Sequence, residues 1–241
     1  MRRRGVLALV AAAVVAGCSV LPPMPPAVPT DVVPTGRPAP SISAGDTQLS
    51  PDGFDAVRRM AVRIRNVGCG VISTGSGFAL TPYTLVTNRH VVADSSQLEL
   101  LTYDGRDVDA TAASTAGLAD LAIVRTAEPL PAAPELAEAD PVVGDPVTVV
   151  GYPLGRRLTV TDGVVVATTT DPLNSGLGDV LVTDAPVEPG SSGSAALDAD
   201  GKVIGVVYAK DDAGYSFLVP VSTLRAMLED EAAFEPAPTC G

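Results

Sequence analysis

Short strand-like segments separated by turn residues recur through most of this chain. In the first, Val62 and Ile64 alternate with Arg63 and Arg65, which is the period of a strand with one buried face. Further segments rich in Val, Ile, Leu, Thr and Tyr span residues 77–80, 84–86, 98–102, 122–125, 147–150, 158–167, 180–183, 195–197, 203–208 and 215–219. Many short strands without long helices between them predict an all-β fold, an antiparallel sandwich or barrel.

Turn dipeptides and two short helices complete the predicted elements. Asp-Gly pairs predict hairpin turns at residues 104–105, 162–163 and 200–201. Ser-Pro-Asp at residues 50–52 has the chemistry of a helix start, so a short helix is expected from there to about residue 59. A last helix is expected over residues 222–230, with Ser222 as its N-cap.

Residues 1–17 have the pattern of an export signal. Arginines open the segment, and an uncharged stretch of small and apolar residues runs from Val6 to Ala16. This stretch is too short to span a bilayer as a mature helix. The segment ends in Ala16-Gly17-Cys18, which resembles a bacterial lipobox and predicts a lipid anchor on Cys18 at the outer face of the cytoplasmic membrane. An ordinary secretory signal followed by a chance cysteine is the alternative.

A proline-rich segment follows the signal. Residues 19–49 hold eight prolines and almost no apolar periodicity, so an extended tether is expected. This tether either lifts a folded domain off the lipid surface or has no function of its own. With the lipidated cysteine it makes up residues 18–49, and residues 50–241 are long enough for one folded domain.

The chain contains three cysteines. If Cys18 carries lipid, Cys69 and Cys240 remain as an even pair in an oxidising compartment. They either form a disulfide that closes nearly the whole folded domain or stay as two buried thiols.

The formal net charge of −12 limits the classes of ligand. Such an acidic chain is expected to bind nucleic acids and anionic membranes poorly, because like charges repel. One histidine and the absence of an acidic run of the EF-hand type do not support a structural zinc or calcium site. We therefore expect no metal, no cofactor and no nucleic-acid partner. A monomer is favoured, although the sequence leaves the oligomeric state open.

The order of three chemically capable residues is the most informative functional feature. The single histidine, His90, lies in TNRHVV and is followed by Asp120 in ADLA and by Ser192 in GSSGS. A hydrolase with the order Ser, Asp/Glu, His is excluded because no histidine follows Ser192, and a subtilisin has the order Asp, His, Ser. What remains is the order found in chymotrypsin.

Acyl transfer to a serine requires a base, a carboxylate that orients the base, and donors for the oxyanion. His90 is the candidate base, Asp120 the orienting carboxylate and Ser192 the nucleophile. The backbone N–H groups of Gly190 and Ser192 are the candidate oxyanion donors, because glycine permits the tight turn that brings them together. Taken singly, each residue also fits a structural role, since a histidine at a strand end or an aspartate in a turn is common.

The chain resembles the trypsin-like serine proteases of the chymotrypsin fold, in particular the bacterial HtrA branch and its MarP-type periplasmic proteases. The segments that carry the resemblance are GSGF at residues 75–78, TNRHVV at 87–92, DLAIV at 120–124, VGDPV to GYP at 143–153, EPGSSGS at 188–194 and GKVIGVV at 201–207. The resemblance implies two packed six-stranded antiparallel barrels and a serine endopeptidase. It also implies a disulfide between Cys69 and Cys240, which match the two cysteines of the MarP-type pattern.

The chain departs from the family pattern beside the nucleophile. Ser191 stands where zymogens have the aspartate that pairs with a new N-terminus, so activation by that salt bridge is not expected. Ser194 and Ala195 replace a glycine and a proline. These changes leave open whether the oxyanion loop is formed at rest.

The resemblance also marks a substrate pocket. Pro186 stands where trypsin-like pockets have their floor, so no carboxylate is there to bind a lysine or arginine side chain. The walls are expected from Val187, Tyr208, Ala209, Lys210 and Gly214. We expect a small or medium apolar side chain on the acyl side of the cleaved bond. Glutamate preference through a pocket histidine is excluded, since the single histidine is used in catalysis.

Two functions are consistent with the sequence. The first is a lipid-anchored serine endopeptidase that hydrolyses extracytoplasmic proteins or peptides. The alternative is a catalytically silent binding module on the same fold at the cell envelope, which the altered residues beside Ser192 keep open. We expect no appended PDZ domain, because only about a dozen residues follow the last predicted helix.

Overall fold

The computed structural model describes residues 56–173 and 177–240. Four predicted features lie outside the described residues: the signal peptide, the lipidation site Cys18, the proline-rich tether and the start of the folded domain at residue 50. So does the first part of the predicted N-terminal helix, whose described part is α1 (Ala56–Arg59). Among the described residues, none of the helices is both long enough and apolar enough to cross a bilayer.

Residues 61–126 form a closed antiparallel barrel. Its strands are β1 (Ala61–Gly68), β2 (Ile72–Thr81), β3 (Thr84–Asn88), β4 (Ser95–Thr102), β5 (Asp107–Ala116) and β6 (Leu121–Thr126). They are hydrogen-bonded in the order β5-β4-β1-β2-β3-β6, and an additional β5–β6 pairing closes the barrel. Closure leaves no unpaired edge strand, which an open sheet of this size would expose.

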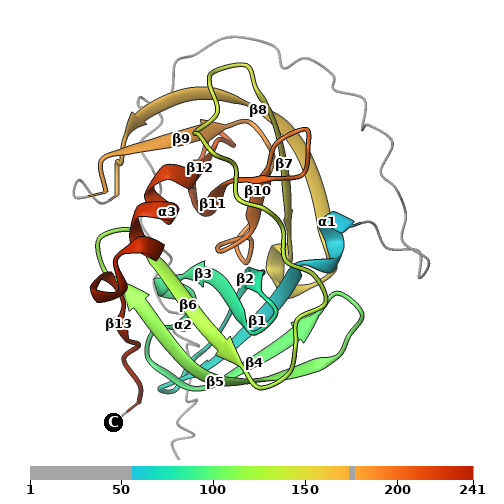
Figure 1. Ribbon diagram of the computed structural model, residues 1–241, viewed down its shortest axis with the longest axis vertical. Coiled ribbons are helices and arrows are strands. Elements are labelled where there is room, and N and C mark those ends of the chain that lie inside the picture. Colours follow the sequence, from blue (N-terminus) through green and yellow to red (C-terminus); the bar gives the residue numbers. More distant parts are fainter. Residues whose placement is uncertain (1–55, 174–176, 241) are drawn as a thin grey trace, which may run out of the picture.

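Residues 146–220 form another closed antiparallel barrel. Its strands are β7 (Pro146–Gly151), β8 (Thr159–Thr170), β9 (Asp179–Thr183), β10 (Ala195–Leu197), β11 (Val203–Lys210) and β12 (Ser216–Pro220), in the order β10-β11-β12-β9-β8-β7. Figure 1 shows this barrel above the first. Over the described residues, the predicted pair of six-stranded barrels is therefore confirmed.

Short helices lie between or after the strands of the barrels. α2 (Arg89–Val92) follows β3, and the 3₁₀ turn η2 (Pro153–Gly155) follows β7. After β12 come α3 (Val221–Glu229), the 3₁₀ turn η3 (Glu231–Ala233) and a two-residue strand β13 (Glu235–Pro236), which pairs with β5. The end of the chain thus leaves the second barrel and adds a strand to the first (Figure 1).

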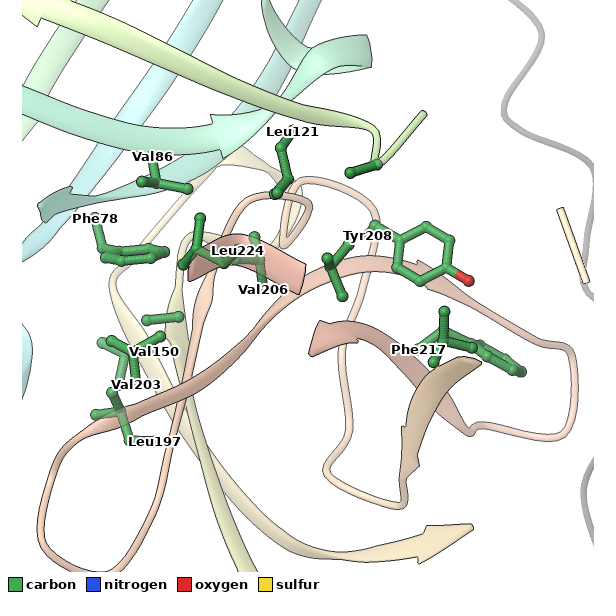
Figure 2. Packing of buried hydrophobic residues seen from close by; sticks show 14 of the residues in the cluster. Phe78, Val86, Leu121, Val150, Leu197, Val203, Val206, Tyr208, Phe217 and Leu224 are labelled. Atoms are coloured by element: carbon green, nitrogen blue, oxygen red, sulfur yellow. The ribbon is translucent and has the colours of Figure 1, made fainter. Parts of the chain in front are cut away.

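The barrels bury apolar side chains inside each barrel and also between them. Phe78 and Ala79 are neighbours on β2 and both are fully buried, although successive strand residues point to opposite faces. Ala79 packs inside the first barrel, whereas Phe78 belongs to a cluster between the barrels. Figure 2 shows Phe78, Val86 and Leu121 of that cluster in the same packed region as residues of the second barrel. Burial of both strand faces fixes the two barrels against each other.

The structure differs from the sequence expectations at a turn, at a strand and at a helix cap. Residues 162–163 do not form a turn but lie within β8, where a Cβ on Gly163 would approach the backbone N of Ala185 to 2.4 Å. Gly163 therefore allows the backbone at Ala185 to pack closely against β8, and it does not reverse the direction of the chain. β5 was not expected from the sequence. The N-cap position of the last helix is Pro220, and Ser222 lies inside the helix.

Candidate active site

A pocket of about 520 Å³ lies between the two barrels. It is lined by all three residues that the sequence predicts to act in catalysis. His90 and Asp120 line it from the first barrel, and Ser192 lines it from the second. These positions are far apart in the sequence, so the packing of the barrels brings them to one cavity.

Strand pairing accounts for the approach of His90 and Asp120. Asn88, the last residue of β3, pairs with Leu121, the first residue of β6. His90 lies just after that end of β3, and Asp120 lies just before that end of β6. Asp120 has a left-handed backbone with φ of 48°, a conformation that aspartate adopts more readily than most residues. Its residue type therefore suits both the turn and the site.

The Asp120 carboxylate holds the imidazole at two points. His90 Nδ1 lies 2.6 Å from Asp120 Oδ2, and the backbone N–H of His90 donates to Asp120 Oδ1 at 3.1 Å. A carboxylate beside Nδ1 favours the tautomer with the proton on Nδ1, which leaves Nε2 free to accept a proton. The side chains are 33% and 25% exposed, so solvent reaches the pair.

Buried Asn66 supports the one-turn helix that carries His90. Its Nδ2 donates to the carbonyl of Val91 at 3.1 Å and to that of Ala93 at 2.9 Å. These carbonyls lie at the C-terminal end of α2, where a helix has no internal donors left. An isolated helix of four residues is not stable, so these contacts contribute to fixing the His90 backbone.

Ser192 lies in a turn that leads into β10 and is anchored to the first barrel. The backbone N–H of Ser76 donates to the Ser192 carbonyl at 2.8 Å. The Ser76 hydroxyl donates to the Gly190 carbonyl at 2.8 Å and accepts from the backbone N–H of Tyr152 at 2.8 Å. The hydrogen bonds of the described residues do not include one between Ser192 Oγ and His90.

The turn at Gly190 presents two backbone donors. Gly190 has a φ of 95°, and a Cβ there would lie 2.8 Å from the backbone N of Leu154. The carbonyl of Pro189 accepts from the Leu154 N–H at 2.6 Å. Because the C=O and N–H of a trans peptide point in opposite directions, this contact directs the Gly190 N–H away from Leu154. Within the described residues, neither the Gly190 nor the Ser192 N–H has a protein acceptor.

The residues beside the nucleophile make local contacts. The Ser191 hydroxyl accepts from the backbone N–H of Glu188 at 3.4 Å, and its own N–H donates to the Glu188 carbonyl at 2.9 Å. The hydroxyl of Ser194 is buried without a partner in the described structure. Ser191 therefore holds the turn through local contacts.

Four of the six residues predicted for the substrate pocket line this cavity, namely Val187, Tyr208, Ala209 and Lys210. Pro186 and Gly214 are exposed and do not line it. The Tyr208 hydroxyl donates to Asp171 Oδ1 at 2.7 Å, and the ring meets Phe217 edge to face. Burial, reinforced by the bond to Asp171, raises the pKa of Tyr208, so the phenol remains uncharged.

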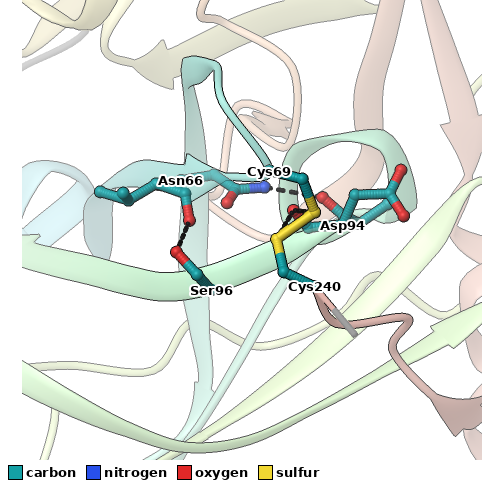
Figure 3. Close-up of a disulfide and its surroundings, with 7 residues drawn as sticks. Asn66, Cys69, Asp94, Ser96 and Cys240 are labelled. Atoms are coloured by element: carbon teal, nitrogen blue, oxygen red, sulfur yellow. Dashed lines mark hydrogen bonds between the residues drawn. A yellow bond between two sulfur atoms is a disulfide. The ribbon is translucent and has the colours of Figure 1, made fainter.

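A disulfide joins Cys69 and Cys240 next to the cavity, with a Cα–Cα distance of 5.6 Å. Figure 3 shows both sulfurs beside Asp94, whose carbonyl lies 3.4 Å and 3.3 Å from the two Sγ atoms. Asp94 also lines the cavity. The bridge therefore fixes the end of the chain to one rim of the site.

No role in the site was predicted from the sequence for Asn66, Ser76 or Glu188, although Ser76 and Glu188 lie within segments that carry the family resemblance. The partners of Asn66 and Ser76 are 25 and 114 residues away, so local spacing carries no signal of these contacts. The Ser76 position falls within the GSGF segment, and that motif is the one sequence feature that could have directed attention to it.

The chain is similar to known proteases over most of its described part. The family model for the trypsin-like peptidase domain matches residues 75–206, more than half of the chain. The mitochondrial serine protease HTRA2 of Bos taurus is 37% identical over 65% of this chain and 36% of its own length. The serine protease Rv3671c of Mycobacterium tuberculosis is 30% identical over 87% of this chain and 54% of its own length.

A solved structure is also similar. The crystal structure of the active form of the Rv3671c protease has a TM-score of 0.71 and 27% identity, covering 92% of this chain and 99% of that chain. The chain thus spans between 36% and 54% of the length of these two curated relatives.

Proposed function

Because this chain belongs to the family of trypsin-like peptidase domains, we propose that it is a serine endopeptidase that hydrolyses peptide bonds of extracytoplasmic proteins. The observation that carries the proposal is the paired imidazole and carboxylate of His90 and Asp120, 2.6 Å apart, in one cavity with Ser192 and two backbone N–H groups without acceptors. His90 and Asp120 supply a base and its orienting anion, and Ser192 supplies the nucleophile.

In the proposed reaction, Nε2 of His90 takes the proton of the Ser192 hydroxyl as its Oγ attacks the scissile carbonyl. Asp120 stabilises the imidazolium that forms. The N–H groups of Gly190 and Ser192 donate to the oxyanion of the tetrahedral intermediate. Collapse of the intermediate breaks the peptide C–N bond, and His90 returns its proton to the leaving amine. Water then attacks the acyl-enzyme by the same proton transfers, which releases the acid and restores Ser192.

Labelling with a fluorophosphonate and a peptidase assay test the proposal. We expect the probe to modify Ser192 in the folded wild type and to lose this site in Ser192→Ala, with far slower labelling in His90→Ala. Turnover by Ser192→Ala should fall on the order of 10⁶-fold if the three residues act as a unit. Undiminished peptide turnover by Ser192→Ala would refute the assignment.

The same experiment tests the second candidate function, a catalytically silent binding module on the same fold. The observation in its favour is that the hydrogen bonds of the described residues do not join Ser192 Oγ to His90. Absence of labelling and of turnover in the folded wild type would support that function.

We also propose that the chain is exported and anchored through lipid on Cys18 at the outer face of the bacterial cytoplasmic membrane. The lipobox-like sequence that ends at Cys18 supports this location. In cells, Cys18→Ala should move the protein from the membrane fraction to the medium. Retention of the variant on the membrane would contradict the anchor.

A further inference from the structure

An ion pair connects the two segments of the second barrel that line the cavity. Lys210 Nζ lies 3.2 Å from Glu188 Oε2, and the side chains are 35% and 58% exposed. Glu188 lies two residues before Gly190, and Lys210 is the last residue of β11. Both residues line the cavity, so the pair joins one wall to the other.

The assignment of the two sides of the cleft rests on the proposed function. That function determines which part of a substrate faces the Glu188–Lys210 pair. His90 must return its proton to the leaving amine, so the leaving group lies on the side of the first barrel. The acyl side then lies along the second barrel, between Val187 to Pro189 and Tyr208 to Lys210. Apart from Glu188 and Lys210, the residues of these two wall segments are uncharged.

We propose that the Glu188–Lys210 ion pair makes the acyl side of the cleft select substrates with uncharged side chains. The carboxylate and the ammonium group largely cancel each other's potential at the walls. A charged side chain that enters the pocket loses hydration and gains no net attraction in return. Either partner alone would instead attract the opposite charge, so the pair determines the charge preference of the site.

Three peptides that differ only in the residue before the cleaved bond test this inference. That residue is leucine, lysine or glutamate. The measured quantities are kcat/KM with catalytically intact protein and Kd by fluorescence anisotropy with the Ser192→Ala form. Lys210→Met should raise the ratio of lysine to leucine peptide by up to about fivefold, the upper end of the range expected for a partly exposed charge pair. Glu188→Gln should raise the ratio of glutamate to leucine peptide by a similar factor.

Ionic strength and a matched control separate charge from local structure. At about 1 M salt the screening length is only about 3 Å, so both ratios should return toward the wild-type values. Lys202 and Glu135 form a comparable exposed ion pair at 3.4 Å, and neither residue lines the cavity. Lys202→Met and Glu135→Gln change the net charge equally and should leave the ratios unchanged. The swapped variant with Glu188→Lys and Lys210→Glu should restore the wild-type ratios.

The outcomes distinguish this inference from the proposed function. Cleavage of the peptides with ratios that do not differ between the cavity variants and their controls would overturn the inference and leave the peptidase standing. Absence of cleavage, with the expected ratio changes in Kd, would overturn the peptidase and support the ion pair as a selector of bound peptides. Neither cleavage nor binding of any of the three peptides would overturn both.

Discussion

Some buried polar side chains between the barrels have no hydrogen-bond partner in the described structure, and Tyr152 is one of them. Its hydroxyl is buried without a hydrogen-bond partner in the described structure, and burial raises the pKa of Tyr152 to about 12. An unfolded tyrosine ionises near pH 10. The free energy of unfolding is therefore unaffected by titration of this group below about pH 10, and it falls as pH rises toward 12, because the unfolded chain loses the proton more readily than the folded protein.

Tyr152→Phe should make the protein more stable at neutral pH by about 1 kcal/mol, because an unpartnered buried hydroxyl is unfavourable. The variant should also avoid about 2–3 kcal/mol of the loss in unfolding free energy between pH 10 and 12. Denaturant titration at pH 7, 10 and 12 measures both effects. The matched control is Tyr83→Phe, since Tyr83 is 53% exposed. A Tyr152→Phe protein that loses stability at pH 7 would contradict this reading.

For individual residues, the sequence was informative where chemistry restricts the residue type. A single histidine, followed by an aspartate and a serine in one particular order, was enough to nominate His90, Asp120 and Ser192, and all three line one cavity. The supporting contacts of Asn66 and Ser76 were not predictable, because a buried serine or asparagine suits many local settings. Their partners are determined only by the packing of distant segments.

Among the elements, α3 shows how a distant loop completes a helix. The N-cap position is Pro220, which offers no side-chain acceptor. Instead, Asp140 from the loop before β7 accepts from the Ser222 N–H at 2.9 Å and from its hydroxyl at 2.5 Å. A carboxylate at this end also interacts favourably with the helix dipole. Asp140 therefore serves as the cap, and Ser222, the sequence-predicted cap, is its donor.

Asp140→Ala should lower the free energy of unfolding by about 1 kcal/mol, as expected for the loss of a helix cap. Asp140→Asn keeps an acceptor and loses only the charge, so its effect should be smaller. Ser222→Ala retains the backbone bond and should also have a smaller effect. Urea denaturation of the three variants measures this order. A larger effect of Ser222→Ala than of Asp140→Ala would show that the Ser222 hydroxyl is the main capping group.

Among the strands, prediction succeeded for those with branched apolar residues and failed for the more polar β5. β5 has the sequence DVDATAASTA, whose alanine, serine and threonine residues give no clear alternation of apolar and polar side chains. Its pairing with both β4 and β6 stabilises it as a strand. The Asp-Gly pair within β8 failed as a turn signal for a related reason, since the register with β7 continues through residues 162–163.

The residues after α3 add a second connection between the two barrels. After α3, β13 pairs with β5, and the Cys240 N–H donates to the Ser95 carbonyl at 3.2 Å. The Cys69–Cys240 disulfide then closes a loop over a sequence separation of 171 residues. This covalent loop contains every strand of the two barrels except β1, so it restricts the unfolded chain over most of the domain.

Reduction of this bridge should lower the stability of the whole domain. The chain-entropy model gives about 5 kcal/mol for a loop of this size, an upper figure because strain and residual structure reduce it. Thermal unfolding of the oxidised protein, the reduced protein and the Cys69→Ser/Cys240→Ser double variant measures the loss. The double variant is the control for thiol chemistry, and it should unfold at a midpoint close to that of the reduced protein. Equal midpoints for all three, with free thiols verified after reduction, would mean that strand pairing and barrel packing alone hold the end of the chain in place.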